Sequence, residues 1–207
     1  FFFFFWLLYW ANKKQTVRFS WNEIALILVI IVVLGFLYGY IFAKYFNGDD
    51  TWYFHQGSIE EQQKLITNPL EFFADFNPIP AFERNPTFAS GWYYYLSDLE
   101  FWVITKPMAL FNLITRGDYY ANVVCFNFLV CWGSIWLYRF LLKTYETKKN
   151  LLFFCVFMMP VPLFWMTGIR AEGWLLFFLA GGLISFEKVL SGLSVKNIAW
   201  LLVSLAG

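Results

Sequence analysis

The sequence is poor in charged residues. Only 14% of its 207 residues are charged, compared with roughly a quarter in an ordinary soluble domain, and 60% are hydrophobic. A soluble globule of this size cannot hide so much apolar surface, so part of that surface must face lipid. The chain has 15 Lys and Arg against 14 Asp and Glu, and this balance offers no basic face for a phosphate backbone. We therefore predict a membrane protein that binds no nucleic acid.

Histidine and cysteine are also scarce. His55 is the only histidine, so a zinc site or a serine–histidine–aspartate triad has no visible partners in the sequence. Cys125, Cys131 and Cys155 lie in apolar runs at spacings that match no CxxC pattern. We interpret them as small core residues. The sequence therefore argues against a zinc-dependent enzyme and against a hydrolase with a catalytic triad.

Long apolar runs predict an all-α, polytopic transmembrane protein. Residues 24–46 have the length that a helix needs to cross a bilayer. Further spans are expected over residues 119–138, 151–167 and 171–190, and a fifth from about residue 198. The chain starts without methionine and stops inside an apolar run, so we expect it to be part of a longer protein.

These spans divide the chain into four parts. We expect a cytoplasmic or interfacial N-terminal segment (1–23), a first transmembrane helix (24–46), a long loop (47–118) and a set of transmembrane helices with short loops (119–207). A loop of this length is usually functional or disordered. Its many aromatic residues argue that it is folded.

The distribution of charge predicts the orientation, because Lys and Arg resist translocation in short loops. The segments on one side of the expected spans contain Lys13, Lys14, Arg18, Arg139, Lys143, Lys148, Lys149, Lys188 and Lys196. The long loop is acidic and contains only four basic residues, Lys64, Arg84, Lys106 and Arg116. We therefore expect the N-terminal segment in the cytoplasm and the long loop outside.

Local signals predict helices within the loop. Ser58 is expected to cap a short polar helix that ends at Thr67. Asn-Pro pairs at 68–69, 77–78 and 85–86 should then break the chain. Residues 99–116 are apolar but interrupted by Pro107, which favours a bent helix in the outer membrane interface.

Two groups of ionisable residues are candidates for chemistry. Asp49 and Asp50 follow the first span, where a partly desolvated carboxylate could serve as a general base or as a metal ligand. Arg170 and Glu172 lie in the turn between the third and fourth spans, on the same expected face. The alternatives are solvated charges at a helix end for the first group and a hairpin-closing ion pair for the second.

Three other ionisable residues of the loop could meet an anionic ligand. They are His55, Arg84 and Lys106. Ordinary surface charge and snorkelling are the alternative interpretations for all three.

Several short strings resemble bacterial membrane glycosyltransferases of the GT-C class. An Asp after the first span, a long outer loop and the strings at 108–113 and 117–122 occur in the order typical of that family. Residues 159–173, with Pro160, Phe164-Trp165 and the string Thr-Gly-Ile-Arg-Ala-Glu-Gly, are similar to the family stretch Pro, Phe-Trp, Ser-Gly-Ile-x-Lys-Glu. The resemblance covers residues 24–190. Ala171 departs from it, because the family usually has Lys there.

The resemblance implies sugar transfer from a polyprenyl-phosphate donor to a glycan, lipid or protein acceptor, in the bacterial inner membrane with the active face outside. Asp49 or Asp50 would be the catalytic base, and the same pair would hold a divalent Mg or Mn ion if one is required. Donor binding would involve Arg170 and Glu172, with contributions from His55, Arg84 and Lys106. The alternative is a non-catalytic scaffold or transporter subunit whose outer loop docks partners.

Overall fold

A computed structural model describes residues 2–13, 18–85 and 87–206, and within these ranges the protein consists of helices and connecting turns. This confirms the all-α prediction. The helices are α1 (Phe2–Lys13), α2 (Trp21–Tyr45), α3 (Asp50–Thr67), α4 (Pro69–Ala74), α5 (Ile79–Arg84), α6 (Phe88–Thr115), α7 (Tyr119–Thr144), the 3₁₀ helix η1 (Glu146–Lys148), α8 (Lys149–Phe157), α9 (Pro160–Met166), α10 (Ala171–Ser191) and α11 (Val195–Ala206).

Among the described residues, three helices are long and apolar enough to cross a membrane, which makes the chain a polytopic membrane protein. They are α2 with 25 residues, α7 with 26 and α10 with 21. The expected span over residues 151–167 is not one straight helix, because η1–α8 and α9 are bent by 49° at the break before Pro160. Proline lacks the N–H that would hydrogen-bond to the preceding helical turn, so it interrupts the helix, but it is favoured in the first turn of a new helix.

Helices α2 and α7 run in opposite directions, and the bent pair η1–α8 and α9 returns the chain, so that α10 runs in the same direction as α7. At one end, the Thr51 hydroxyl after α2 lies 2.7 Å from the hydroxyl of Tyr119 at the start of α7. At the other end, Lys143 of α7 pairs with Glu187 of α10 at 2.7 Å. We call these the Asp49 end and the Lys143 end. Of the basic residues expected in the cytoplasm, Lys14 lies outside the described residues.

Close helix packing forms the core of the bundle. Phe126, Val130 and Tyr138 of α7 are buried against Ile24 and Leu28 of α2 and their neighbours. Cys125 and Cys131 lie in this core as expected, whereas Cys155 is exposed on α8.

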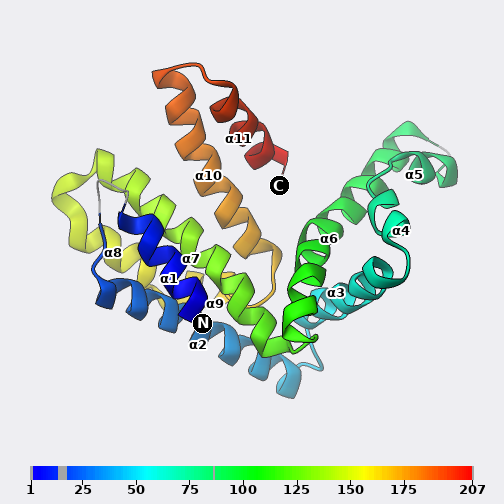
Figure 1. The fold of residues 1–207 in the computed structure, drawn as a ribbon, viewed down its shortest axis with the longest axis horizontal. Helices are drawn as coiled ribbons and strands as arrows, with labels where there is room; N and C mark the ends of the chain where they lie inside the picture. Colours follow the sequence, from blue (N-terminus) through cyan, green and yellow to red (C-terminus); the bar gives the residue numbers. More distant parts are fainter. Residues whose placement is uncertain (1, 14–17, 86, 207) are drawn as a thin grey trace.

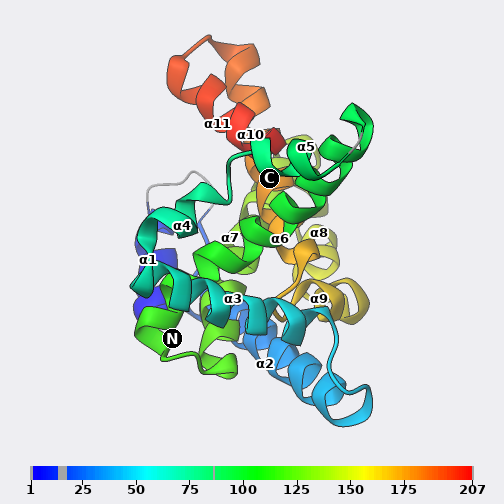
Figure 2. The same cartoon turned by 90° about the vertical axis from the view of Figure 1, so that its right-hand side faces the viewer.

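Gly133 of α7 is required for the contact between α7 and α10. A Cβ atom at this position would lie 2.8 Å from the Cα atom of Phe177 in α10. Only a residue without a side chain lets two helix backbones approach this closely. Beyond this contact, α10 and α11 form a hairpin that projects from the bundle in both views (Figure 1, Figure 2).

The long loop folds into α3, α4, α5 and α6, which gather on one side of the molecule (Figure 1). The prediction that Ser58 begins a helix is wrong. The helix begins at Asp50 with Asp49 as its N-cap, and Ser58 is buried in its interior with its hydroxyl donating to the His55 carbonyl at 2.7 Å. Ser is common at N-caps, but it also occurs within helices where its hydroxyl bonds a preceding carbonyl.

The breaks within the loop follow the Asn-Pro pairs. α3 ends at Thr67 and α4 begins at Pro69, with the Asn68 side chain accepting the N–H of Glu71. α4 and α5 are separated around Pro78, while Pro86 lies outside the described residues. α6 begins earlier than expected, at Phe88, and carries Pro107 in its interior.

Candidate functional site

Arg170 is the centre of a polar cluster at the Asp49 end. Its Nη1 donates to Asp49 Oδ2 at 2.8 Å and to the Tyr38 hydroxyl. Its Nε and Nη2 donate to the two carboxylate oxygens of Glu172 at 2.9 and 2.8 Å. Asp50 Oδ2 lies 3.5 Å from Nη2. The structure thus brings together Asp49, Asp50, Arg170 and Glu172, which we call the Arg170 cluster.

The turn before α10 is shaped to present Arg170 to α2. Gly168 has φ +87°, a conformation that residues with a side chain rarely adopt. The next residue, Ile169, donates its backbone N–H to the buried Thr51 hydroxyl at 3.0 Å. This hydrogen bond ties the turn to the start of α3. The conformation of Gly168 and the hydrogen bond of Ile169 therefore place the next residue, Arg170, within reach of Asp49.

The Arg170 cluster carries an excess of negative charge. Three carboxylates surround one guanidinium, and exposure of the side chain rises from 10% for Arg170 to 27% for Asp49 and 61% for Asp50. An anionic ligand that approaches the Arg170 guanidinium therefore also meets two unbalanced carboxylates.

The cluster stabilises the ionised form of Asp49. Burial by itself raises the pKa of this carboxyl, but hydrogen bonds from the Tyr38 hydroxyl and the Asp50 backbone and the charge of Arg170 outweigh that effect. The resulting pKa lies below the ordinary value. Hydrogen bonding to Glu172 likewise raises the pKa of Arg170 despite its burial. Asp49 is therefore a carboxylate, able to accept a proton, at neutral pH.

The cluster does not form a ready metal site. Among the described residues, no three His, Cys, Asp or Glu side chains are grouped so that they could hold a metal ion. Asp49 Oδ2 is already occupied by Tyr38 and Arg170. The divalent ion expected from the sequence would therefore share the Asp49 carboxylate with Arg170, and the described residues offer it no third ligand of these types.

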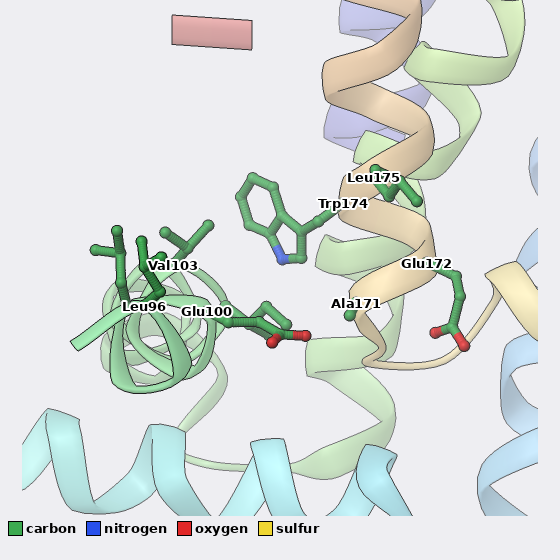
Figure 3. Close-up of a pocket in the computed structure, with 9 residues that line it drawn as sticks. Leu96, Glu100, Val103, Ala171, Glu172, Trp174 and Leu175 are labelled. Carbon is green, nitrogen blue, oxygen red and sulfur yellow. The ribbon is translucent and has the colours of Figure 1, made fainter. Parts of the chain in front are cut away.

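A cavity of about 430 Å³ lies next to the cluster, between α6 and α10. Leu96 and Val103 line its α6 side, and the Trp174 ring projects into it from α10 (Figure 3). Glu100 points from α6 toward Ala171, whereas Glu172 points away on the other side of α10 (Figure 3). The cavity is therefore mostly apolar, with a carboxylate of α6 at its wall.

His55 lies in a separate buried network. Its Nδ1 is 3.3 Å from Nδ2 of Asn122, whose amide also donates to Asn112 Oδ1 at 2.5 Å. Burial lowers the pKa of His55, although Asp118 opposes this effect. A neutral imidazole with Nδ1 unprotonated fits the contact with the Asn122 amide. These hydrogen bonds link α3, α6 and α7, so His55 stabilises the packing of the three helices.

Lys106 and Arg84 also lie outside the Arg170 cluster. Lys106 is 3% exposed and donates to Glu61 at 2.5 Å, to Asp75 at 2.9 Å and to the Phe72 carbonyl at 2.6 Å. Arg84 is exposed and its Nε donates to the Pro80 carbonyl at 3.0 Å, at the end of α5. The contacts of both side chains stabilise the folded loop.

Sequence reasoning missed Tyr38 and Thr51. Both are fully buried, and both contribute a hydroxyl to the contacts that hold the cluster. The available signal was that Tyr38 lies in an apolar span 11 residues before Asp49, where its hydroxyl needs a partner.

Comparison of the chain with protein-family models, with curated proteins and with solved structures finds no match.

Proposed function

We propose that this chain carries the catalytic carboxylate of a membrane glycosyltransferase of the GT-C class. The enzyme moves a sugar from a polyprenyl-phosphate donor to a glycan, lipid or protein acceptor at the outer face of the bacterial inner membrane. One observation carries the proposal: Asp49 and Glu172 are both bound by Arg170, although 121 residues separate Asp49 from Arg170. The resemblance requires two acids from these segments at one site.

The proposed reaction is a single displacement. The acceptor oxygen attacks the anomeric carbon and forms the new glycosidic bond, while the bond from that carbon to the phosphate oxygen breaks. The polyprenyl phosphate leaves with the electron pair, and the configuration at the anomeric carbon is inverted. The acceptor's hydroxyl proton passes to the enzyme's carboxylate, which acts as general base.

Asp49 is the best candidate for that base. Tyr38 and Arg170 keep it ionised and fixed, while 27% of its side chain is exposed to an incoming hydroxyl. Asp50 is 61% exposed and lies 3.5 Å from Arg170, so its orientation is less restricted. Glu172 uses both oxygens to bind Arg170.

Arg170 is the candidate to stabilise the leaving phosphate. Its Nε and Nη2 form the two-pronged donor face that binds Glu172 here and can bind a phosphate in the same bidentate way. A donor phosphate must therefore compete with Glu172 for this face, and Nη1 can keep its contact with Asp49 meanwhile. Positive charge near the departing oxygen lowers the barrier to its departure.

The orientation of the site follows from charge. The acidic loop joins the Asp49 end, and the Lys143 end carries basic residues such as Arg139 and Lys143. The preference of Lys and Arg for the cytoplasmic side supports an outer location for the Asp49 end. That is the face where a lipid-linked sugar is available without a nucleotide.

A scaffold or transporter subunit is the second candidate. Arg170 is engaged by three carboxylates, which would suit a latch between the α9–α10 turn and α2. Ala171, where the family usually has Lys, also fits a chain without catalysis. In this case the loop helices α3–α6 would bind a partner.

Sugar transfer from polyprenyl-phosphate donors by the full-length protein in lipid tests the proposal. Asp49→Asn should lower turnover by roughly 10²- to 10⁴-fold, the usual contribution of a general base. Glu146→Gln is the matched control, because Glu146 is an exposed acid of η1. Full activity of Asp49→Asn would refute the assignment of the base. If the parent protein transferred no sugar from any of the donors, the scaffold function would be favoured.

A further inference from the structure

Tyr38 is held rigidly at the edge of the Arg170 cluster. Its side chain is fully buried in α2. Its ring stacks on Phe42 at 4.3 Å between centroids and also contacts the rings of Phe164 and Trp165 at 5.0 and 6.0 Å. Side chains of α2 and α9 therefore enclose the ring, and its hydroxyl has one accessible position.

That hydroxyl lies between the two charged groups of the site. It donates to Asp49 Oδ2 at 2.5 Å and accepts from Arg170 Nη1. The same Asp49 oxygen also accepts from Arg170 Nη1 at 2.8 Å. Among the described residues, the side chains that bind the Asp49 carboxylate, Tyr38 and Arg170, thus both bind Oδ2, and the Asp50 backbone adds a further hydrogen bond to the group.

A carboxylate whose side-chain partners bind one oxygen presents the other in a fixed direction. Oδ2 accepts two hydrogen bonds, so it is the weaker base of the two oxygens. Oδ1 is left for the acceptor hydroxyl. Arg170 alone would not fix this geometry, because its guanidinium is shared with Glu172 and Asp50.

We propose that Tyr38 is a positioning residue for Asp49: its hydroxyl binds Oδ2, so that Oδ1 receives the acceptor's proton. This inference rests on the proposed function, since it assigns a role within that site. Tyr38 itself transfers no proton to the substrate. It sets which oxygen of the base reacts.

Tyr38→Phe removes the hydroxyl and keeps the ring. The matched control is Tyr138→Phe, because Tyr138 of α7 is equally buried and its hydroxyl has no hydrogen-bond partner among the described residues. Tyr38→Phe should lower kcat by roughly 10- to 100-fold, the size expected for one hydrogen bond to a charged group. KM for the donor should change less than kcat, because Tyr38 contacts Nη1 of Arg170 and not the Nε and Nη2 atoms that would bind the donor.

Protonation of Asp49 supplies a readout that does not depend on activity. Labelling by a water-soluble carbodiimide follows the protonation of a carboxyl group, and peptide fragmentation distinguishes Asp49 from Asp50. In Tyr38→Phe the pH midpoint for labelling of Asp49 should rise by about one unit, since the hydroxyl no longer stabilises the anion. Tyr138→Phe should leave the midpoint where it is in the parent protein.

A second variant keeps the hydroxyl and the packing. Replacing Tyr38 by 3-fluorotyrosine gives a more acidic donor, so the labelling midpoint of Asp49 should move to lower pH. An unchanged midpoint in both Tyr38 variants would overturn the inference, whether or not transfer is detected. If the midpoint moves as expected but the parent protein transfers no sugar, the proposed function fails and the contact between Tyr38 and Asp49 stands.

Discussion

The ion pair between Lys106 of α6 and Glu61 of α3 can be tested through the stability of the loop helices. Both side chains are 4% exposed and their charged atoms lie 2.5 Å apart. Lys106 also binds the Phe72 carbonyl and Asp75, so its ammonium group has three protein acceptors. Lys106→Met would keep the aliphatic length and remove every one of these contacts.

The expected cost comes from the charge that is left behind. Removing one partner of a buried pair costs about 3–5 kcal/mol, because the remaining charge is buried without compensation. Lys64 stays 2.8 Å from Glu61 and is 36% exposed, so it compensates in part. We therefore expect the lower value of about 3 kcal/mol, which corresponds to roughly a hundredfold in the opening equilibrium.

Hydrogen exchange of the α3 amides in lipid measures that opening directly. Exchange in Lys106→Met should accelerate by roughly a hundredfold, and the double variant Lys106→Met/Glu61→Leu should recover much of the protection. Lys143→Met is the control, since its pair with Glu187 is exposed and worth less than about 1 kcal/mol. If Lys106→Met exchanged its α3 amides at the wild-type rate but had a raised KM for the donor, this reasoning would be refuted and a role of Lys106 in donor binding favoured.

Topology, pH and the turn before α10 provide three further tests. The topology is tested in a background in which Cys155, an exposed cysteine, is replaced by Ser. A cysteine introduced at exposed Gln63 should react with an impermeant thiol reagent in intact cells, and one introduced at Lys148 should not. The reverse labelling would contradict the orientation. Burial lowers the pKa of His55 in the folded protein, so as the pH falls the unfolded chain binds a proton at a higher pH than the folded chain. Thermal stability should therefore fall as the pH decreases below about 6.5. His55→Gln should weaken this dependence. Gly168→Ala should destabilise by about 1–2 kcal/mol, because φ is +87° and its Cβ would lie 3.2 Å from Tyr38, whereas Gly192→Ala meets open space; equal melting temperatures would contradict this.

Hydropathy predicts α2, α7 and α10, whereas the span expected over residues 151–167 is broken before Pro160, and α11, where a fifth span was expected, has only 12 residues. α2, α7 and α10 lie close to the expected ranges because an apolar run of this length has few alternatives in a membrane protein. Alternation of the spans also predicts that Asp49 and Arg170 occur on one face. Their 2.8 Å contact goes beyond that prediction, since it depends on the turn around Gly168.

Contacts across the long loop could not be derived from the sequence. The sequence makes Lys106 a candidate for ligand binding because it is a cation of the outer loop that could meet an anionic ligand. Its partner Glu61 is 45 residues away and becomes adjacent only when α3 packs on α6. The start of α3 was misplaced for a related reason: Ser58 looks like a cap until tertiary packing buries it against Asn112, whose amide donates to its hydroxyl at 2.9 Å.

The charge balance at Arg170 bears on the choice between enzyme and scaffold. A latch that serves stability needs one acid for one guanidinium, and each additional acid adds repulsion. Here Asp49, Asp50 and Glu172 all lie within 3.5 Å of Arg170, and Asp49 stays 27% exposed. Proteins retain such locally unfavourable arrangements mainly at functional sites. A surplus of partly exposed carboxylates around one guanidinium therefore favours the proposed transferase over a scaffold.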